Sequence, residues 1–471
     1  MSAQASIVGS GPNGLSAAIV LVHAGLEVEV FEAEEVPGGA VRTLELTLPG
    51  FRHDFGSAVY PLGAGSPFFS SLPLGDFGLE WIHSPAPLAH PFDDGTAVVL
   101  ERNLEDTKRA LGEDGKAWAD LLQPFIEEWP AFSREVLRPV PSIPKHPLLL
   151  AQFGLKALLP ATALARRFTS DRTRALFAGI AAHSFLSLNE TLSGAFGMLM
   201  AIPAHAVGWP IARGGAQSLT NALCAHFEKL GGRIKTSSRI ESLDQLPNSD
   251  LYLLNVTPRQ LLKIAGDRLR ESYKRILRRF RYSPGAFKID YALREPIPWR
   301  APDCARAATV HLGGSFDEIA ASESAARNGE HAERPFILLT QPSLFDPLRA
   351  PEGKHTAWAY CHVPNGSTFD MLPRIENQIE RFAPGFRECV LARRVFRPID
   401  LEAMDSNLVG GDVAGGITDV RQFLFRPSWR RYATSTPNIY ICSASTPPGG
   451  GVHGMCGYHA AKTALSRLKP S

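Results

Sequence analysis

Three glycines near the start of the chain have the spacing of a nucleotide-binding turn. Gly9, Gly11 and Gly14 follow the apolar run 5–8 and open a helical pattern. In such a turn the first glycine allows a tight bend, the second lets a pyrophosphate approach the backbone, and the third lets helix and strand pack closely. The pattern therefore predicts a dinucleotide held at the start of the helix, where backbone N–H groups favour phosphate.

An acid and a second glycine group follow this turn. Glu32 ends the next segment of alternating apolar residues, where a carboxylate can accept both hydroxyls of a ribose. Gly38, Gly39 and Arg42 come after it in "EAEEVPGGAVRT". This extension resembles flavoproteins with two dinucleotide-binding domains, in which the paired glycines and the arginine approach the FAD pyrophosphate. The resemblance favours FAD over NAD, and the chain shows no second glycine fingerprint with a flanking helix.

A third glycine run lies near the C-terminus. Gly449, Gly450 and Gly451 precede Val452, and a helical pattern begins near Gly454. The start of that helix could face the flavin N1 and C2 carbonyl and stabilise the negative charge of the reduced ring. The residues predicted to bind FAD are Gly9, Gly11, Pro12, Asn13, Gly14, Glu32, Ala33, Gly38, Gly39, Arg42, Arg213, Ile240, Gly450, Gly451 and Val452.

The elements that carry these residues are far apart along the chain. Strand and helix patterns at 5–30, at 215–256 and in the last forty residues predict one α/β, Rossmann-like FAD-binding domain assembled from discontinuous segments. We place that domain at 1–100, 203–270 and 421–471. The intervening segments, 101–202 with a helical pattern and 271–420 with mixed strands, predict an α+β substrate-binding domain with a helical insertion.

Composition excludes several classes of protein. The 49 basic and 47 acidic residues nearly cancel, so no surface for nucleic acid is indicated. The six cysteines are scattered without a CxxC pair, which argues against a metal site and a disulfide framework and favours a reducing, cytoplasmic location. No signal peptide is expected. The uncharged segment 191–212 is long enough to cross a bilayer, but its glycines and prolines favour a core or pocket wall instead.

Motifs along the whole chain resemble one family. The segments "PGGAVRT", "FRHDFGSAVYPL", "ARGGAQSLTNAL" and "RQFLFRPSWRRYATSTPNIYICSASTPPGGGVHGMCGYHAA" are similar to those of the phytoene desaturase-like, or carotenoid desaturase-like, FAD-dependent oxidoreductases. Within them the chain most resembles the branch of pyridine nucleotide-disulphide oxidoreductase domain-containing protein 2. Members usually have a histidine in a "THPGGG" run, whereas Pro447 occupies that position here, so no role of that histidine is transferred. The resemblance implies a flavin facing an apolar tunnel.

A flavin desaturase moves a hydride from carbon to N5 while a proton leaves the neighbouring carbon, so no dedicated base is required. His453, by its place in the terminal loop, and His53 with Asp54, in "FRHDFGS", are candidates for contact with the reacting atoms. Each also has a plain structural interpretation. Arg426 is interpreted as an ion-pair partner or as an anchor for an anionic substrate.

The sequence favours an FAD-dependent desaturase or dehydrogenase acting on a lipophilic substrate, such as a polyene or isoprenoid. The alternatives are a flavin amine oxidase, although the terminal region has no clear aromatic pair to cage an amine, and a non-catalytic FAD-holding redox or interaction protein. The electron acceptor, oxygen or quinone, and the oligomeric state are left open. The segment 148–168, with Lys156, Arg166 and Arg167, is a candidate for peripheral membrane contact.

Overall fold

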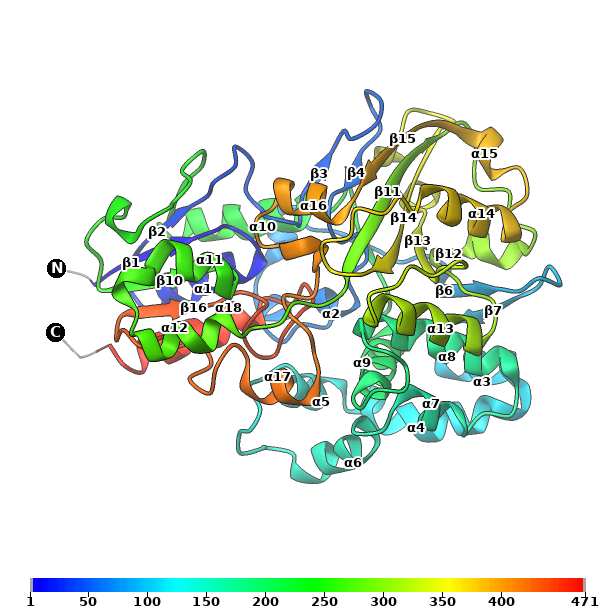
Figure 1. Ribbon diagram of the computed structural model, residues 1–471, viewed down its shortest axis with the longest axis horizontal. Coiled ribbons are helices and arrows are strands. Elements are labelled where there is room, and N and C mark those ends of the chain that lie inside the picture. The colour runs from blue at the N-terminus through cyan, green and yellow to red at the C-terminus, as the bar shows by residue number, and fades with distance from the viewer. Residues whose placement is uncertain (1–2, 469–471) are drawn as a thin grey trace.

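Two β-sheets form the framework of the protein. The computed structural model describes residues 3–468, and Figure 1 shows the two sheets at opposite ends of the long axis. The smaller sheet, sheet 1, contains the first strand of the chain and lies beside its last helix. The larger sheet, sheet 2, is flanked by a layer of helices on one side.

Sheet 1 is fully parallel and confirms the predicted Rossmann-like fold. Its strands run in the order β16 (Ile439–Ile441), β10 (Leu251–Leu254), β1 (Gln4–Val8), β2 (Glu27–Phe31) and β9 (Arg233–Lys235). Apolar residues of these strands pack on both faces, as a parallel sheet requires. One face is covered by α1 (Pro12–His23), α10 (Gln217–Lys229) and α18 (Met455–Leu465), and the other by α11 (Pro258–Ala265) and α12 (Glu271–Arg278).

The order of the strands in sheet 1 locates the binding crevice. The chain builds outward from β1 through β2 to β9 on one side, and through β10 to β16 on the other. The direction of winding therefore changes between β1 and β10. Ligands of open parallel sheets bind at such a point, outside the carboxyl ends of the strands. The first glycine turn follows β1 at that edge.

Sheet 2 is mixed and has seven strands. Their order is β15 (Val390–Phe396), β11 (Gly285–Leu293), β14 (His355–Val363), β13 (Ile337–Thr340), β12 (Ala307–Leu312), β6 (Ala86–Pro91) and β7 (Ala97–Leu100). Neighbours pair antiparallel except β12 and β6. Two small sheets join β3 (Thr43–Leu44) to β4 (His53–Asp54), and β5 (Trp81–Ile82) to β8 (Ile211–Ala212).

The segment 101–202 is helical, as its pattern predicts. It forms α3 (Leu104–Ala110), α4 (Gly115–Glu127), α5 (Trp129–Val136), α6 (Pro147–Ala157), α7 (Ala161–Ala165), α8 (Asp171–Ala181) and α9 (Ser193–Ala206). Pro203 lies inside α9 and does not end it, because it stands within the last turn. None of the helices among residues 3–468 is both long and apolar enough to cross a bilayer.

The strand pairing contradicts two of the predicted boundaries. β6 and β7 fall within the segment 1–100 assigned to the FAD domain, yet they pair with sheet 2. Their apolar residues pack on both faces of sheet 2, with Leu88, Val98 and Leu100 in the helical layer and Ala86, Ala89 and Val99 on the opposite face. The remaining helices are α2 (Pro61–Ala64), α13 (Phe316–Arg327), α14 (Leu372–Phe382), α15 (Phe386–Cys389), α16 (Pro398–Met404) and α17 (Val420–Phe425). The loop after α16 lines the dinucleotide crevice, although 271–420 was assigned to the substrate domain.

Candidate FAD site and substrate cavity

The first glycine turn has the backbone that a pyrophosphate needs. Gly9 has φ +91°, a conformation that side chains disfavour. A Cβ on Gly14 would lie 2.0 Å from the carbonyl oxygen of Gly9, so only glycine lets α1 pack this closely on β1. A Cβ on Gly11 would meet the Asn255 amide nitrogen at 3.0 Å. The turn is therefore held close to the loop after β10 and leaves its backbone uncovered.

Glu32 is fixed at the end of β2 by the turn itself. Its Oε2 accepts hydrogen bonds from the Ser10 backbone N–H at 2.8 Å and from the Ser10 hydroxyl at 2.5 Å, and its Oε1 accepts one from the Glu34 N–H at 3.0 Å. The side chain is 5% exposed and lines the large cavity described below. Oε1 accepts only one of these hydrogen bonds and keeps a further lone pair, so the group can still accept from a ribose hydroxyl.

Arg42 connects the second glycine pair to a distant loop. Its Nε donates to the carbonyl oxygen of Gly39 at 2.7 Å, and its Nη2 donates to that of Met404 at 3.2 Å. The guanidinium also lies over the ring of Phe55, 5.5 Å from the centroid. Gly38, with φ +131°, packs against Thr220 of α10. The arginine thus places a positive charge at the crevice and anchors the loop after α16 there.

The C-terminal glycine run reaches the same crevice. Gly450, Gly451 and Val452 line the cavity, and α18 begins at Met455. The first turn of α18 packs tightly on that of α1: a Cβ on Gly457 would lie 1.7 Å from the carbonyl oxygen of Asn13. The loop before the helix, and not the helix N-terminus itself, borders the cavity.

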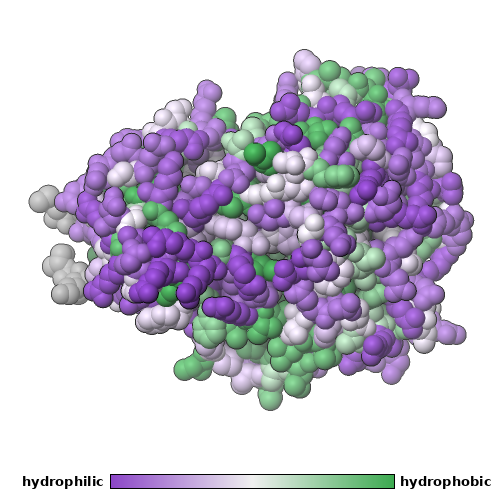
Figure 2. Space-filling model, viewed as in Figure 1, coloured by the Kyte–Doolittle hydropathy of each residue, from purple (hydrophilic) through white to green (hydrophobic). Residues whose placement is uncertain are grey.

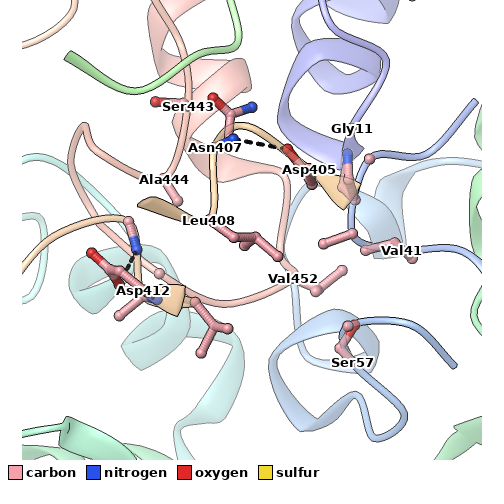
Figure 3. Close-up of a pocket in the computed structure, with 18 of the residues that line it drawn as sticks. Gly11, Val41, Ser57, Asp405, Asn407, Leu408, Asp412, Ser443, Ala444 and Val452 are labelled. Atoms are coloured by element: carbon pink, nitrogen blue, oxygen red, sulfur yellow. Dashed lines mark hydrogen bonds between the residues drawn. The ribbon is translucent and has the colours of Figure 1, made fainter. Parts of the chain in front are cut away.

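These segments surround one cavity of about 840 Å³. Figure 3 shows Gly11, Val41, Asp405, Leu408 and Val452 around the same opening, although they come from four separate parts of the chain. The cavity continues from the dinucleotide turns to the space between sheet 2 and α9. The lining of this second part includes His183, Phe185, Phe196, Met200, Trp209, Thr309, Leu338, Thr340, Trp358 and Tyr360. The uncharged segment 191–212, through Phe196, Met200 and Trp209, thus supplies a wall of the cavity, as expected.

Most of the residues predicted to bind the dinucleotide lie at this cavity. Those that line it are Gly9, Gly11, Pro12, Asn13, Glu32, Ala33, Gly39, Arg42, Ile240, Gly450, Gly451 and Val452. Gly14 and Gly38 stand behind the lining and serve packing. Arg213 is a wrong assignment: its side chain is exposed and its Nε forms a surface ion pair with Glu80 at 2.7 Å.

None of the three candidate catalytic residues lines the cavity. His53 is enclosed between Thr47, at 2.8 Å, and Asp290, and burial lowers its pKa to about 3. Asp54 accepts hydrogen bonds from Thr43 at 2.8 Å and from Arg349 at 2.5 Å. "FRHDFGS" therefore builds the support beneath the site, because β4 turns both side chains into the core.

His453 and Arg426 also serve the terminal loop. The Nδ1 of His453 accepts a hydrogen bond from the Met455 N–H at 3.0 Å, and burial lowers the pKa of the imidazole to about 4. Arg426 is buried and donates to the carbonyl oxygens of Gly415 and Gly416 at 2.9 and 3.3 Å. Among residues 3–468 no carboxylate forms an ion pair with Arg426, and Arg426 does not line the cavity.

Sequence reasoning missed a buried ion pair on the cavity side of sheet 2. The Nζ of Lys288 lies 2.5 Å from an Asp290 carboxylate oxygen, and the lysine lines the cavity between the rings of Trp358 and Phe396. Burial raises the pKa of Asp290 to about 6, against the opposing effect of Lys288. The charged pair in the apolar strand "GAFKIDYAL" was the signal that could have revealed it.

The loop after α16 was missed as well. Asp405, Asn407 and Leu408 line the crevice (Figure 3), and Asp405 accepts a hydrogen bond from the Asn407 N–H at 3.0 Å. Burial raises the pKa of Asp405. The glycine-rich run "LVGGDVAGG" lacks the flanking helix of a nucleotide fingerprint, but it closes one side of the cavity.

FAD fits the site formed by the glycine turns with their uncovered backbone, the acid at the end of β2, Arg42 and the terminal loop. The fold is that of an FAD-dependent oxidoreductase. A family model described as flavin containing amine oxidoreductase matches residues 13–268. The chain belongs to this family.

Relatives along the whole chain agree with that assignment. The chain is 25% identical to mouse (Mus musculus) pyridine nucleotide-disulfide oxidoreductase domain-containing protein 2, over 99% of this chain and 94% of that protein. It is 24% identical to a phytoene dehydrogenase of Streptomyces griseus, over 95% and 91% of the two chains. The resemblance to phytoene desaturase-like oxidoreductases is thus confirmed.

Solved structures share the fold. An oxidoreductase from Methanosarcina mazei superposes with a TM-score of 0.67 at 17% identity, over 98% of this chain and all of that one. Putrescine oxidase bound to putrescine superposes with a TM-score of 0.59 at 14% identity, over 99% of each chain.

Proposed function

We propose that this FAD-dependent oxidoreductase is a desaturase or dehydrogenase of a lipophilic substrate, such as a polyene or isoprenoid. The observation that carries the proposal is the continuity of the cavity. It runs from the dinucleotide turns into a chamber walled by Phe185, Phe196, Met200 and Leu338. A chamber of this lining binds apolar molecules and excludes water from the reacting atoms.

Bound FAD would accept a hydride from substrate carbon. The protein then has to position a C–H bond beside the flavin and keep the chamber dry. The apolar walls supply the exclusion of water. Lys288 lines the chamber, and its charge is balanced by Asp290, which is buried behind the lining, so the chamber carries little net charge toward a neutral substrate.

The alternative of an amine oxidase has weaker support. A cationic amine is stabilised by a carboxylate close to it. Among the described residues, the acids that line the cavity are Glu32, Glu34, Glu241, Asp405 and Asp412. They all belong to the dinucleotide side or the loop after α16, and none comes from sheet 2 or α9. An amine in the chamber would therefore lack a partner charge.

Anaerobic mixing of the holoprotein with candidate substrates tests the proposal. A polyene or isoprenoid that is oxidised should bleach the oxidised flavin absorbance band, whereas a primary amine of similar length should not. Bleaching by amines would favour an amine oxidase. Bleaching by no compound of either class would favour a flavin-holding protein without turnover.

We further propose that oxygen or a quinone reoxidises the flavin, because the chain shows one dinucleotide fingerprint. Mixing the reduced protein with each acceptor in a stopped-flow instrument distinguishes the two. Recovery of the band with NAD as the acceptor would contradict the proposal.

A surface close to the chamber supports a proposal of peripheral membrane contact. Ile143, Leu148 and Leu155 are 90%, 86% and 77% exposed, and Leu158 and Leu159 lie beside them in sequence. Figure 2 shows hydrophobic residues along the lower edge, where Figure 1 places α6. We call the surface formed by these five residues the leucine face. We propose that the leucine face rests on an anionic bilayer, with the exposed Lys145, Arg166 and Arg167 nearby in sequence. α6 packs on α9, and α9 forms a wall of the chamber. A lipophilic substrate would therefore have a short path from the bilayer to the chamber.

Flotation with vesicles of anionic lipid tests the membrane proposal. The wild-type holoprotein should float with the vesicles, and the double variant Leu148→Ser, Leu155→Ser should not. A matched control is Leu348→Ser, which replaces an exposed leucine on another part of the surface. Equal flotation of all three proteins would contradict the proposal.

A further inference from the structure

A row of side chains crosses the cavity face of sheet 2. Lys288 on β11 pairs in register with Tyr360 on β14, Tyr360 with Leu338 on β13, and Leu338 with His311 on β12. Residues paired in this way lie on the same face of the sheet. Because adjacent strands are about 4.8 Å apart, His311 lies about 14 Å from Lys288 along the row. The row therefore extends from the ion pair into the chamber.

The Tyr360 hydroxyl is a free donor in this row. Tyr360 lines the cavity and remains partly exposed although it stands in a central strand. Its hydroxyl makes no hydrogen bond with residues 3–468, and it is not among the polar atoms that packing encloses. Burial raises the pKa of the phenol above its usual range, so the hydroxyl keeps its proton.

A pair of histidines supplies a second donor. The Nε2 atoms of His183 and His311 lie 3.1 Å apart, so one ring donates to the other. Burial lowers the pKa of His183 to about 3 and that of His311 well below its usual value, so both rings are neutral. The Nδ1 of His311 is enclosed without a partner against Gly179 of α8, where a Cβ would lie 2.7 Å from it.

The packing around His311 selects the tautomers. A proton on His311 Nδ1 would be an orphaned N–H in the core, which folded proteins avoid more strictly than an orphaned acceptor. The His311 proton therefore belongs on Nε2, where it is donated to His183. The proton of His183 then lies on Nδ1, which has no partner among the described residues and is not enclosed. Since His183 lines the cavity, Nδ1–H is available to a ligand there.

We propose that Tyr360 and His183 bind a neutral oxygen atom of the substrate, which is thus a lipophilic carbonyl, ether or alcohol and not a plain hydrocarbon. The inference rests on the proposed function and narrows its substrate class. Both donors face the same largely apolar chamber, and a hydrocarbon would leave both unpaired when it displaces water. Lys288 is committed to Asp290, so the chamber has no free positive charge for a carboxylate.

Binding of a matched ligand series to the oxidised holoprotein under anaerobic conditions tests the inference. The ligands are a medium-chain 2-alkanone and the n-alkane and n-alkylamine of the same length. Calorimetry and the shift of the flavin absorbance band report binding without turnover. The ketone should bind about tenfold more tightly than the alkane, the effect of one or two net hydrogen bonds.

Tyr360→Phe removes one hydroxyl without changing the packing and should abolish most of this preference. His183→Phe should do the same, and flavin content per protein verifies that the variants are folded. Tyr291→Phe is the matched control, because the Tyr291 hydroxyl is also unpartnered but faces the other side of sheet 2, against Phe386. It should retain the wild-type preference.

Several results would overturn the inference: equal affinity for ketone and alkane, an unchanged preference in Tyr360→Phe, tighter binding of the amine, or binding of no ligand. The proposed function fails separately. A hydrocarbon polyene that bleaches the flavin while the ketone preference is absent refutes the inference alone. A ketone preference without bleaching by any lipophilic compound refutes the proposed function alone.

Discussion

Substitution of Gly457 by alanine tests whether the two ends of the chain must touch at the FAD site. Gly457 lies in the first turn of α18, and an added Cβ would stand 1.7 Å from the Asn13 carbonyl oxygen and 3.0 Å from the Ala17 nitrogen. Both are backbone atoms of α1 and cannot rotate away. An ordinary contact needs 3.4 Å or more, so the helices would have to separate by about 1.7 Å.

Two opposing effects determine the expected change in the free energy of unfolding. Alanine is preferred over glycine inside a helix by about 0.5–1 kcal/mol. Overpacking against a rigid neighbour costs about 1–3 kcal/mol. We therefore expect Gly457→Ala to lose about 1–2 kcal/mol overall. Because Asn13 and Val452 line the cavity beside these helices, the affinity for FAD should fall as well.

Urea denaturation at a fixed concentration of FAD, followed by circular dichroism and flavin fluorescence, measures the loss. Gly154→Ala is the control, because this glycine lies inside α6 with open space where its Cβ would be. It should gain about 0.5–1 kcal/mol. If Gly457→Ala were as stable as wild type, or gained stability like Gly154→Ala, the contact between α1 and α18 would be looser than described.

Three further predictions concern charged residues at or near the cavity. Lys288→Met leaves Asp290 without its partner, and the raised pKa of that carboxyl then rises further. The variant should lose about 3–5 kcal/mol at pH 8 and little at pH 4, where the buried acid is protonated in the folded wild type and the folded variant alike. Urea denaturation at the two pH values measures this, and an equal loss at both would be inconsistent with it. Glu32→Gln removes the charge that accepts from Ser10 and should weaken FAD binding at least tenfold in an equilibrium titration; unchanged affinity would show that Glu32 only shapes the turn. Arg213→Ala should change the free energy of unfolding by no more than about 1 kcal/mol and leave FAD content unaltered, because its ion pair is exposed; loss of flavin would restore the original assignment.

The dinucleotide half of the site was predictable because backbone requirements fix residue types. Gly9 is required by a tight turn, Gly11 by the close approach of a pyrophosphate to the backbone, and Gly14 by the packing of α1 on β1. Glu32 follows them at the end of the next strand. Parallel strands also have short, strongly apolar patterns. These local rules identified all five strands of sheet 1 and the helices α1, α10 and α18 on one face, but not α11 and α12 on the other face.

The substrate half depends on contacts that no local pattern encodes. His53 and Asp54 resemble reactive residues in sequence, yet β4 turns them toward Asp290 and Arg349, both more than two hundred residues away. β6 and β7 were predicted to belong to the first domain because their own residues do not indicate which strands they pair with. The loop around Asp405 reaches the cavity through Arg42, a contact that spans most of the chain.

The arrangement of sheet 1 also constrains when the protein can acquire its cofactor. β1 pairs with β10, and β10 pairs with β16, so the nucleotide fold requires residues 4–8 and 439–441 at once. A growing polypeptide emerges from the ribosome N-terminus first, and the helices α3–α9 can form from local contacts while the rest is being translated. β1 has both of its partner strands once β10 is made, but the edge strand β16 and the helix α18 that packs on α1 come only at the end of translation. Flavin capture is therefore a late event in biogenesis, and any product of interrupted translation that ends before Ile439 would be colourless and prone to aggregate.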